Sequence, residues 1–127
     1  MNEKQTDCIS NEVSYSNTSM RAEYFFVKNE FKLTRIDFRD ILYIEGMGDY
    51  QCIHTLNERI MTLQTFDKLF MKLPTRCFAR IHKSFIISIE KISVIEKNHV
   101  RINEKDIPIG MKYKDEFFNQ LKEQFLI

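Results

Sequence analysis

The 127-residue chain has no tryptophan, only three glycines and two prolines, and no long apolar segment. A membrane-spanning helix needs roughly 18–20 consecutive apolar residues, and no run of that length occurs in the sequence. The first seven residues also lack the apolar stretch of a secretory signal peptide. These absences predict a cytoplasmic, soluble protein that has no membrane partner.

The sequence also lacks a large excess of one charge. Its formal net charge is +1, so the total charge does not by itself indicate a nucleic-acid partner. Residues 1–75 contain 9 Lys and Arg against 11 Asp and Glu, whereas residues 76–127 contain 10 against 7. If the chain binds DNA, a local basic patch must therefore make the contacts.

Cysteine and histidine are too few and too widely spaced to indicate a zinc site or a disulfide framework. The six residues of these two types are Cys8, Cys52, Cys77, His54, His82 and His99. Cys52 and His54 could share one face of a strand, but a third and a fourth ligand are not evident near them. The sequence therefore predicts no metal and no other cofactor.

Catalytic motifs are absent as well. Gly46 and Gly48 are followed by neither the third glycine nor the helix that a dinucleotide-binding loop requires. Glu45 and Asp49 flank the same turn, but nothing near them indicates the desolvated cleft that acid–base catalysis needs. The sequence therefore does not predict an enzyme.

Short segments rich in apolar residues, most of them alternating with polar ones, predict many strands. Their ranges are 24–28, 31–36, 41–45, 50–55, 60–63, 78–87, 92–95, 100–102 and 107–109. The segment 41–45 is apolar almost throughout, which is typical of a strand buried on both faces. Pro108 has no N–H group for a sheet ladder, so its strand should lie at a sheet edge.

Two amphipathic helices complete the pattern. Thr65 is a suitable N-cap for the first helix, and Pro74 ends it. The apolar stripes are Phe66, Leu69, Phe70 and Leu73 in the first helix, and Tyr113, Phe117, Leu121 and Phe125 in the second. We therefore predict a mainly β domain with one short internal helix and a C-terminal helix.

The domain is expected to span residues 23–123. Residues 1–22 are rich in Asn, Ser and Thr and show no periodicity, so they are predicted to be a disordered lead or linker. Residues 124–127 would form a short C-terminal tail.

The predicted strand 78–87 carries the most informative polar residues. Between its apolar ends lie four side chains that can donate to phosphate oxygens or base edges: Arg80, His82, Lys83 and Ser84. Strand alternation places Lys83 on the opposite face from Arg80 and His82. The four can therefore share one surface only if the strand ends or bends near His82. Such a cluster suggests anion binding but does not identify the anion.

Residues 80–85, Arg-Ile-His-Lys-Ser-Phe, closely resemble the Arg-x-His-Arg-Ser-Phe/Tyr core of LytTR-type DNA-binding domains, which are output modules of many bacterial response regulators. Further similarity lies at residues 40–46, 48–50, 53–55, 90–92 and 107–114, so the resemblance covers roughly residues 23–121. It implies an elongated arrangement of antiparallel β-sheets that reads DNA through loops rather than through a recognition helix.

The resemblance also implies roles for individual residues. It implies base contacts for Lys83, Lys112, Tyr50 and Gln51. It implies phosphate contacts for Arg80, Ser84 and Lys114, and a loop-orienting role for His82 and Asp49. At two of these base-reading positions the family more commonly has arginine, whereas this chain has Lys83 and Lys112. Lysine lacks the planar guanidinium of arginine, so it cannot make the same bidentate contact with a base. A solvated Lys83 and a tight hairpin at Asp49 without any ligand are the alternatives.

The function implied is sequence-specific DNA binding by a transcription regulator, the output domain of a two-component-like system. Its loops would enter successive major grooves, and it would bind paired repeats as a dimer. An upstream sensor kinase or receiver domain is the expected signalling partner, although no receiver domain fits before Glu23. The alternative is a β-rich protein-interaction or ligand-sensing module that does not bind DNA. The modest net charge, the two lysines and the acidic Asp49 favour this alternative.

Overall fold

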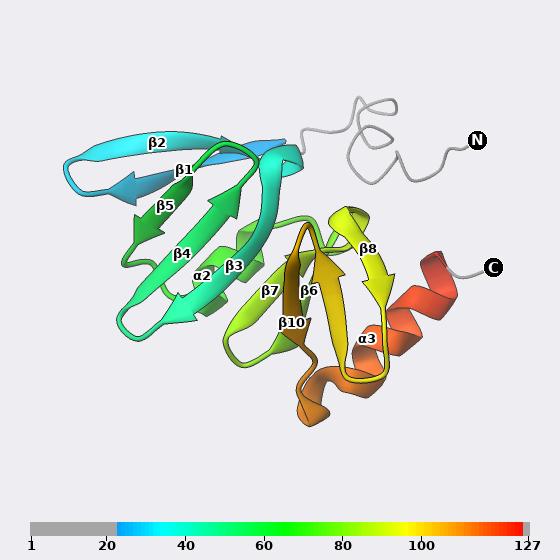
Figure 1. Ribbon diagram of the computed structural model, residues 1–127. Coiled ribbons are helices and arrows are strands. Elements are labelled where there is room, and N and C mark those ends of the chain that lie inside the picture. The colour runs from blue at the N-terminus through cyan, green and yellow to red at the C-terminus, as the bar shows by residue number, and fades with distance from the viewer. Residues whose placement is uncertain (1–22, 126–127) are drawn as a thin grey trace.

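A computed structural model describes residues 23–125, which form three antiparallel β-sheets, two α-helices and two short 3-10 helices (Figure 1). The predicted lead, residues 1–22, lies outside the described residues. In chain order the elements are β1 (Tyr24–Asn29), β2 (Lys32–Asp37), η2 (Phe38–Asp40), β3 (Ile41–Met47), β4 (Tyr50–Thr55), β5 (Arg59–Thr62), α2 (Phe66–Lys72), β6 (Phe78–His82), β7 (Phe85–Ser88), η3 (Ile89–Lys91), β8 (Ile92–Ile95), β9 (His99–Ile102), β10 (Lys105–Pro108) and α3 (Met111–Gln124).

The sheets follow one another along the molecule (Figure 1). β1 and β2 form a separate hairpin, the central sheet has the order β5-β4-β3-β7-β6, and the third sheet has the order β10-β9-β8. The predicted mainly β fold with an internal and a C-terminal helix is confirmed. Pro108 lies in β10, an edge strand, as its missing N–H group predicted.

Four hairpins turn through two-residue loops, and in three of them, all except β6–β7, the first loop residue has a positive φ. These residues are Glu30 (58°), Gly48 (74°) and Asn103 (57°). Such loops match the twist of the flanking strands. Glycine adopts the conformation without a steric cost, which explains the glycine in the β3–β4 turn.

The central sheet carries a hydrophobic core on each face. β3 contributes to both, because Ile41 and Ile44 belong to the core under α2 whereas Leu42 and Tyr43 belong to the core under α3. The prediction that this strand is buried on both faces is therefore confirmed. Burial of so much apolar surface is the main favourable term for folding.

The internal helix α2 begins as predicted. The Oγ1 atom of Thr65 accepts a hydrogen bond from the N–H of Lys68 at 3.1 Å and so caps the helix. Leu69 and Leu73 of the predicted stripe are buried in the first core, with Phe66 and Phe70 packed against it.

The prediction of one strand over residues 78–87 is wrong. β6 ends at His82, Lys83 and Ser84 form a turn, and β7 begins at Phe85. The register of the ladder between β6 and β7 also shifts between Arg80 and His82. The segment contains no Gly, Pro, Asn or Asp that would mark a turn in the sequence. Arg80, His82, Lys83 and Ser84 could share one surface only if the strand ended or bent near His82. The strand does end there.

Among residues 23–125 no helix is long and apolar enough to cross a membrane. Within the same residues, no group of three or more His, Cys, Asp or Glu side chains could hold a metal ion. Cys52 is a free, buried cysteine, whereas Cys77 is disulfide-bonded, a bond that the wide cysteine spacing did not predict.

Candidate nucleic-acid interface

Three connections meet along one edge of the molecule, the lower edge in Figure 1: the β3–β4 turn, the β6–β7 turn and the segment that leads into α3. The N–H of Gly46 donates a hydrogen bond to the carbonyl of Ser84 at 2.8 Å and joins the first connection to the second. The N–H of Gly110 donates to the carbonyl of Ile81 at 2.7 Å and joins the third. These two bonds bring together segments that are far apart in the sequence.

The two glycines that donate these hydrogen bonds lie in contact with neighbouring segments. A Cβ atom on Gly46 would lie 3.3 Å from Oε1 of Gln51 and 3.7 Å from Cα of Ser84. A Cβ atom on Gly110 would lie 3.6 Å from Cα of His82. Only the contact at Gly46 is tighter than ordinary van der Waals contact, so a side chain there would require Gln51 to shift, whereas Gly110 has room for a Cβ atom.

Arg80 ties the β6–β7 turn to α2. Its Nη2 group donates to the carbonyl of Lys83 at 2.8 Å, and its Nε group donates to the carbonyl of His82 at 3.4 Å. Nη1 donates to Oδ1 of Asp67 at 3.0 Å, and the guanidinium lies 4.7 Å from the ring centre of Phe66. All three guanidinium nitrogens of Arg80 thus donate to groups of the same chain. This geometry favours a role in fixing the shape of the turn rather than a phosphate contact.

His82 supports the same turn from within. Its Nδ1 atom accepts a hydrogen bond from the N–H of Ser84 at 3.0 Å, and its ring meets that of Phe85 edge to face at 5.6 Å. A neutral imidazole in this arrangement carries its proton on Nε2. This geometry agrees with the predicted loop-orienting role, which stays a prediction.

The side chains predicted to read bases differ in exposure. Lys83 in the β6–β7 turn and Lys112 in the first turn of α3 are exposed. Tyr50 is 48% exposed at the start of β4, next to the exposed Asp49. Gln51 is only 8% exposed and packs near Gly46. The structure therefore favours Tyr50 over Gln51 as the side chain that this turn presents.

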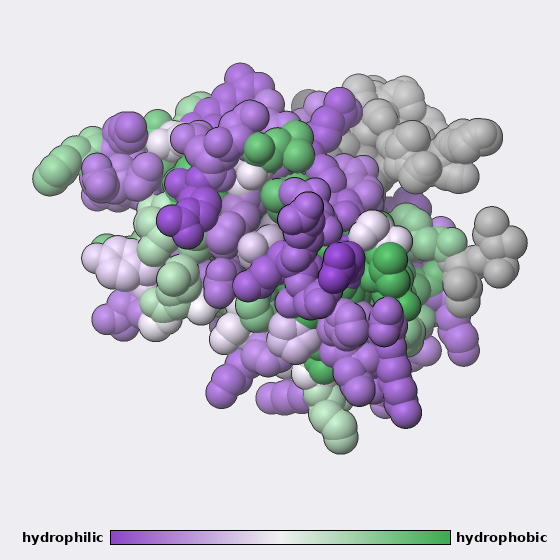
Figure 2. All heavy atoms as spheres, in the orientation of Figure 1, coloured by the Kyte–Doolittle hydropathy of each residue, from purple (hydrophilic) through white to green (hydrophobic). Residues whose placement is uncertain are grey.

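The predicted phosphate contacts beside Arg80 are also placed along this edge. Nζ of Lys114 donates to Oδ1 of Asn98 in the β8–β9 turn at 2.9 Å, which holds the amine near the start of α3. The Ser84 hydroxyl makes no side-chain hydrogen bond within residues 23–125. Figure 2 shows many hydrophilic side chains along this lower edge. Both groups keep donors that an anion could use.

Two exposed methionines flank the same turns, and no residue pattern in the sequence predicted a role for them. Met47 is 48% exposed at the end of β3, and Met111 is 87% exposed at the start of α3. Apolar side chains can contact the methyl group of thymine in a major groove. The sequence offered one indication of a role for Met111, namely its position between Gly110 and the predicted base contact Lys112.

A polar pair lies behind the β3–β4 turn. Nε2 of His54 is 3.1 Å from Oε1 of Glu45, and the His54 ring stacks on Tyr43 with ring centres 4.2 Å apart. Burial lowers the pKa of His54, and the hydrogen bond to Glu45 opposes this only in part. Burial likewise raises the pKa of Tyr43 and of Cys52. Burial thus favours the neutral forms of these groups.

Comparison with known proteins agrees with this geometry. Residues 32–122 match the model of the LytTr DNA-binding domain family. The fold is similar to that of a solved LytTr DNA-binding domain from Bacillus cereus, with a TM-score of 0.71 at 17% identity over 79% of this chain and 97% of that one. The transcriptional regulatory protein NatR of Bacillus subtilis (strain 168) is 33% identical over 66 residues.

The match covers 52% of this chain but only 28% of NatR, so the chain spans a minor part of that relative. The family model, in contrast, covers most of the chain. The protein therefore belongs to the LytTr DNA-binding domain family, a family of DNA-binding domains and not of enzymes. The family resemblance inferred from residues 80–85 is confirmed.

Proposed function

We propose that this domain regulates transcription as the output of a two-component-like signalling system. It would insert the β6–β7 turn, the β3–β4 turn and the start of α3 into successive major grooves. The observation that carries the proposal is the joining of these three segments along one edge by two short backbone hydrogen bonds. Such preorganisation lowers the cost of ordering loops when DNA binds.

In this proposal Lys83, Lys112 and Tyr50 contact bases, because all three are exposed on the shared edge. A lysine can donate to O6 and N7 of guanine, although without the bidentate geometry of arginine. Gln51 has less support because it is buried. Asp49 would shape the turn, since its carboxylate would be repelled by phosphate.

Phosphate contacts would come from Ser84 and Lys114, together with the N-terminal turn of α3. The first N–H groups of a helix face outward, and nearby lysines add positive charge, which suits an anionic oxygen. Arg80 would act chiefly by holding the β6–β7 turn in shape. Its predicted phosphate contact would need the donors that its internal hydrogen bonds leave free.

A domain of this size makes few phosphate contacts, so one copy alone should bind weakly. We propose that two copies bind paired repeats as a dimer on DNA. An upstream sensor kinase or receiver domain would supply the signal, and the protein would act in the cytoplasm. The domain would comprise residues 23–123.

The test is selection of binding sites from a DNA pool with random positions, followed by fluorescence anisotropy of the selected duplex at increasing salt. We expect a paired motif and a linear decrease of log K with log salt, whose slope counts the neutralised phosphates. Absence of enrichment, together with absence of binding at low salt, would contradict the proposal. The remaining function would then be the protein-interaction or ligand-sensing module.

A further inference from the structure

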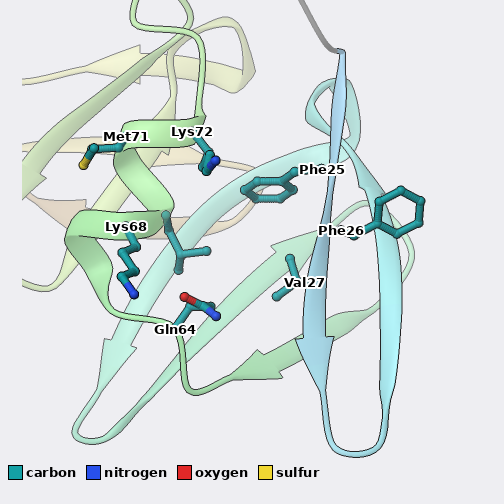
Figure 3. A pocket seen from close by; sticks show the side chains of 8 residues that line it. Phe25, Phe26, Val27, Gln64, Lys68, Met71 and Lys72 are labelled. Atoms are coloured by element: carbon teal, nitrogen blue, oxygen red, sulfur yellow. The ribbon is translucent and has the colours of Figure 1, made fainter.

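A groove lies between the β1–β2 hairpin and α2 (Figure 3). Its volume is about 560 Å³, within the range of roughly 300–1,000 Å³ typical of ligand pockets. Apolar atoms of Phe25, Val27 and Leu69 line it, and Gln64 lies at the end near α2. The groove is therefore large enough for one or two bulky side chains.

The edge formed by the β3–β4 turn, the β6–β7 turn and the start of α3 is the proposed DNA-binding edge. The groove and Arg80, which supports this edge, contact different faces of α2. Residues 66 and 67 contact Arg80, whereas residues 68, 69, 71 and 72 line the groove. At 100° per residue the two sets point in nearly opposite directions. A molecule bound in the groove would therefore stay clear of the three DNA-reading segments.

The rim of the groove carries two lysines that have no acidic partner among residues 23–125. Lys68 and Lys72 lie one helical turn apart, and neither ammonium group has an ion-pair partner within residues 23–125. Among the part of the chain that the structure describes, no acidic residue lines the groove. The nearest acid in sequence, Asp67, is already paired with Arg80. The chain as a whole is almost neutral, so this local excess of positive charge favours an anionic partner.

Exposed apolar side chains surround the same groove. Met71 lines the groove and is 80% exposed, and Leu63 beside Gln64 is 66% exposed. The ring of Phe26, 59% exposed, lies on the opposite face of β1 from Phe25 and Val27 and points away from α2 (Figure 3). Phe31, in the loop of the same hairpin, is fully exposed as well. Clusters of exposed apolar residues on a soluble domain usually mark an interaction surface.

We propose that this groove docks an acidic peptide segment of a partner protein. One or two aromatic or leucine side chains of the segment would enter between Phe25, Val27 and Leu69. Its carboxylates would pair with Lys68 and Lys72. A concave site with apolar walls fits side chains better than a flat lipid surface, and DNA phosphates would leave the exposed apolar residues unused.

The inference goes beyond DNA binding and does not depend on it, because the groove and the DNA-binding edge are separate. The test uses the full chain and a fluorescein-labelled 12-residue peptide of Glu, Phe and Leu. A matched peptide carries Lys in place of every Glu. Binding is measured by fluorescence anisotropy without DNA.

We expect the acidic peptide to bind the unmodified chain and the basic peptide not to bind. The double variant Lys68→Glu/Lys72→Glu should lose about tenfold or more in affinity for the acidic peptide, since two attractive pairs become repulsive. The same variant should gain affinity for the basic peptide, a result that loss of folding cannot produce. Met71→Gln, which keeps the side-chain length, should weaken binding several-fold. The matched control Lys97→Glu/Lys105→Glu changes two exposed lysines of the third sheet and should leave affinity unchanged.

Equal binding of the two peptides, or no binding of the acidic one, would overturn the proposal. So would binding that Lys68→Glu/Lys72→Glu leaves unchanged. Sedimentation equilibrium and co-sedimentation with phosphatidylglycerol vesicles test two other occupants. If Lys68→Glu/Lys72→Glu abolishes self-association, the groove binds a second copy of the chain. If it abolishes vesicle binding, the groove binds a lipid surface. Either result would overturn the proposal of an acidic peptide. Displacement of the peptide by the selected DNA duplex would refute the separation of the two sites.

Discussion

Arg80→Ala tests whether Arg80 holds the β6–β7 turn or contacts a phosphate. A charge-assisted hydrogen bond such as that to the Lys83 carbonyl contributes about 1.5–3 kcal/mol, and the cation–π contact with Phe66 adds about 0.5–1 kcal/mol. Asp67 is 84% exposed, so its ion pair with Arg80 adds at most about 1 kcal/mol. We therefore expect the substitution to lower the free energy of unfolding by about 2–5 kcal/mol.

Two measurements check this expectation. Urea denaturation gives the loss of stability, and anisotropy with the selected duplex at several salt concentrations gives the affinity and its salt slope. Affinity should fall because the turn is no longer preorganised, whereas the slope should stay the same because no phosphate contact is removed. Arg80→Lys should behave like the alanine variant, since lysine keeps the charge but lacks the fork.

The control is Arg76→Ala, which removes an exposed arginine that has no ion pair within residues 23–125. Its free energy of unfolding should stay within about 0.5 kcal/mol of the unmodified chain. The reasoning is refuted if Arg80→Ala leaves stability unchanged and lowers the salt slope by about 0.9, the value for one phosphate contact. Arg80 would then be a phosphate contact, as the family resemblance implied.

Three further substitutions test the interface and the polar pair behind it. Lys83→Ala should weaken binding to the selected site by about 1–3 kcal/mol and relax the preference at one base pair; an unchanged preference in a repeated selection would exclude base reading. Lys114→Ala should weaken binding to all sequences alike and lower the salt slope by roughly one, whereas a loss confined to the selected site would make it a base contact. Burial lowers the pKa of His54 in the folded state, so the unfolded state binds more protons once the pH drops below about 6.5. Stability should therefore fall as the pH decreases from about 6.5 through the folded pKa. In urea denaturation His54→Gln should show a smaller fall over this range, and an equal fall would exclude His54 as a cause.

The sequence by itself determined most of the secondary structure, because strands, caps and turns depend on near neighbours. Alternation identified strands such as β2, Thr65 marked the start of α2, and Pro108 indicated an edge strand. The motif at residues 80–85 also indicated the family. The same local patterns failed where β6 ends at His82, because the only turn-favouring residue there is Ser84, whose hydroxyl is a weak turn signal.

Tertiary structure alone decided which donors reach the surface and which are used inside. Arg80 meets Asp67, thirteen residues away in sequence, and its donors are occupied there and at the turn carbonyls. Gln51 is buried, although a polar residue next to a turn is usually exposed. Gly46 in β3 meets Ser84, just before the start of the neighbouring strand β7, although the two are far apart in sequence. Such contacts depend on how separate elements pack. The residue pattern of one segment indicates which of its faces is buried, but not which residues of other segments that face meets.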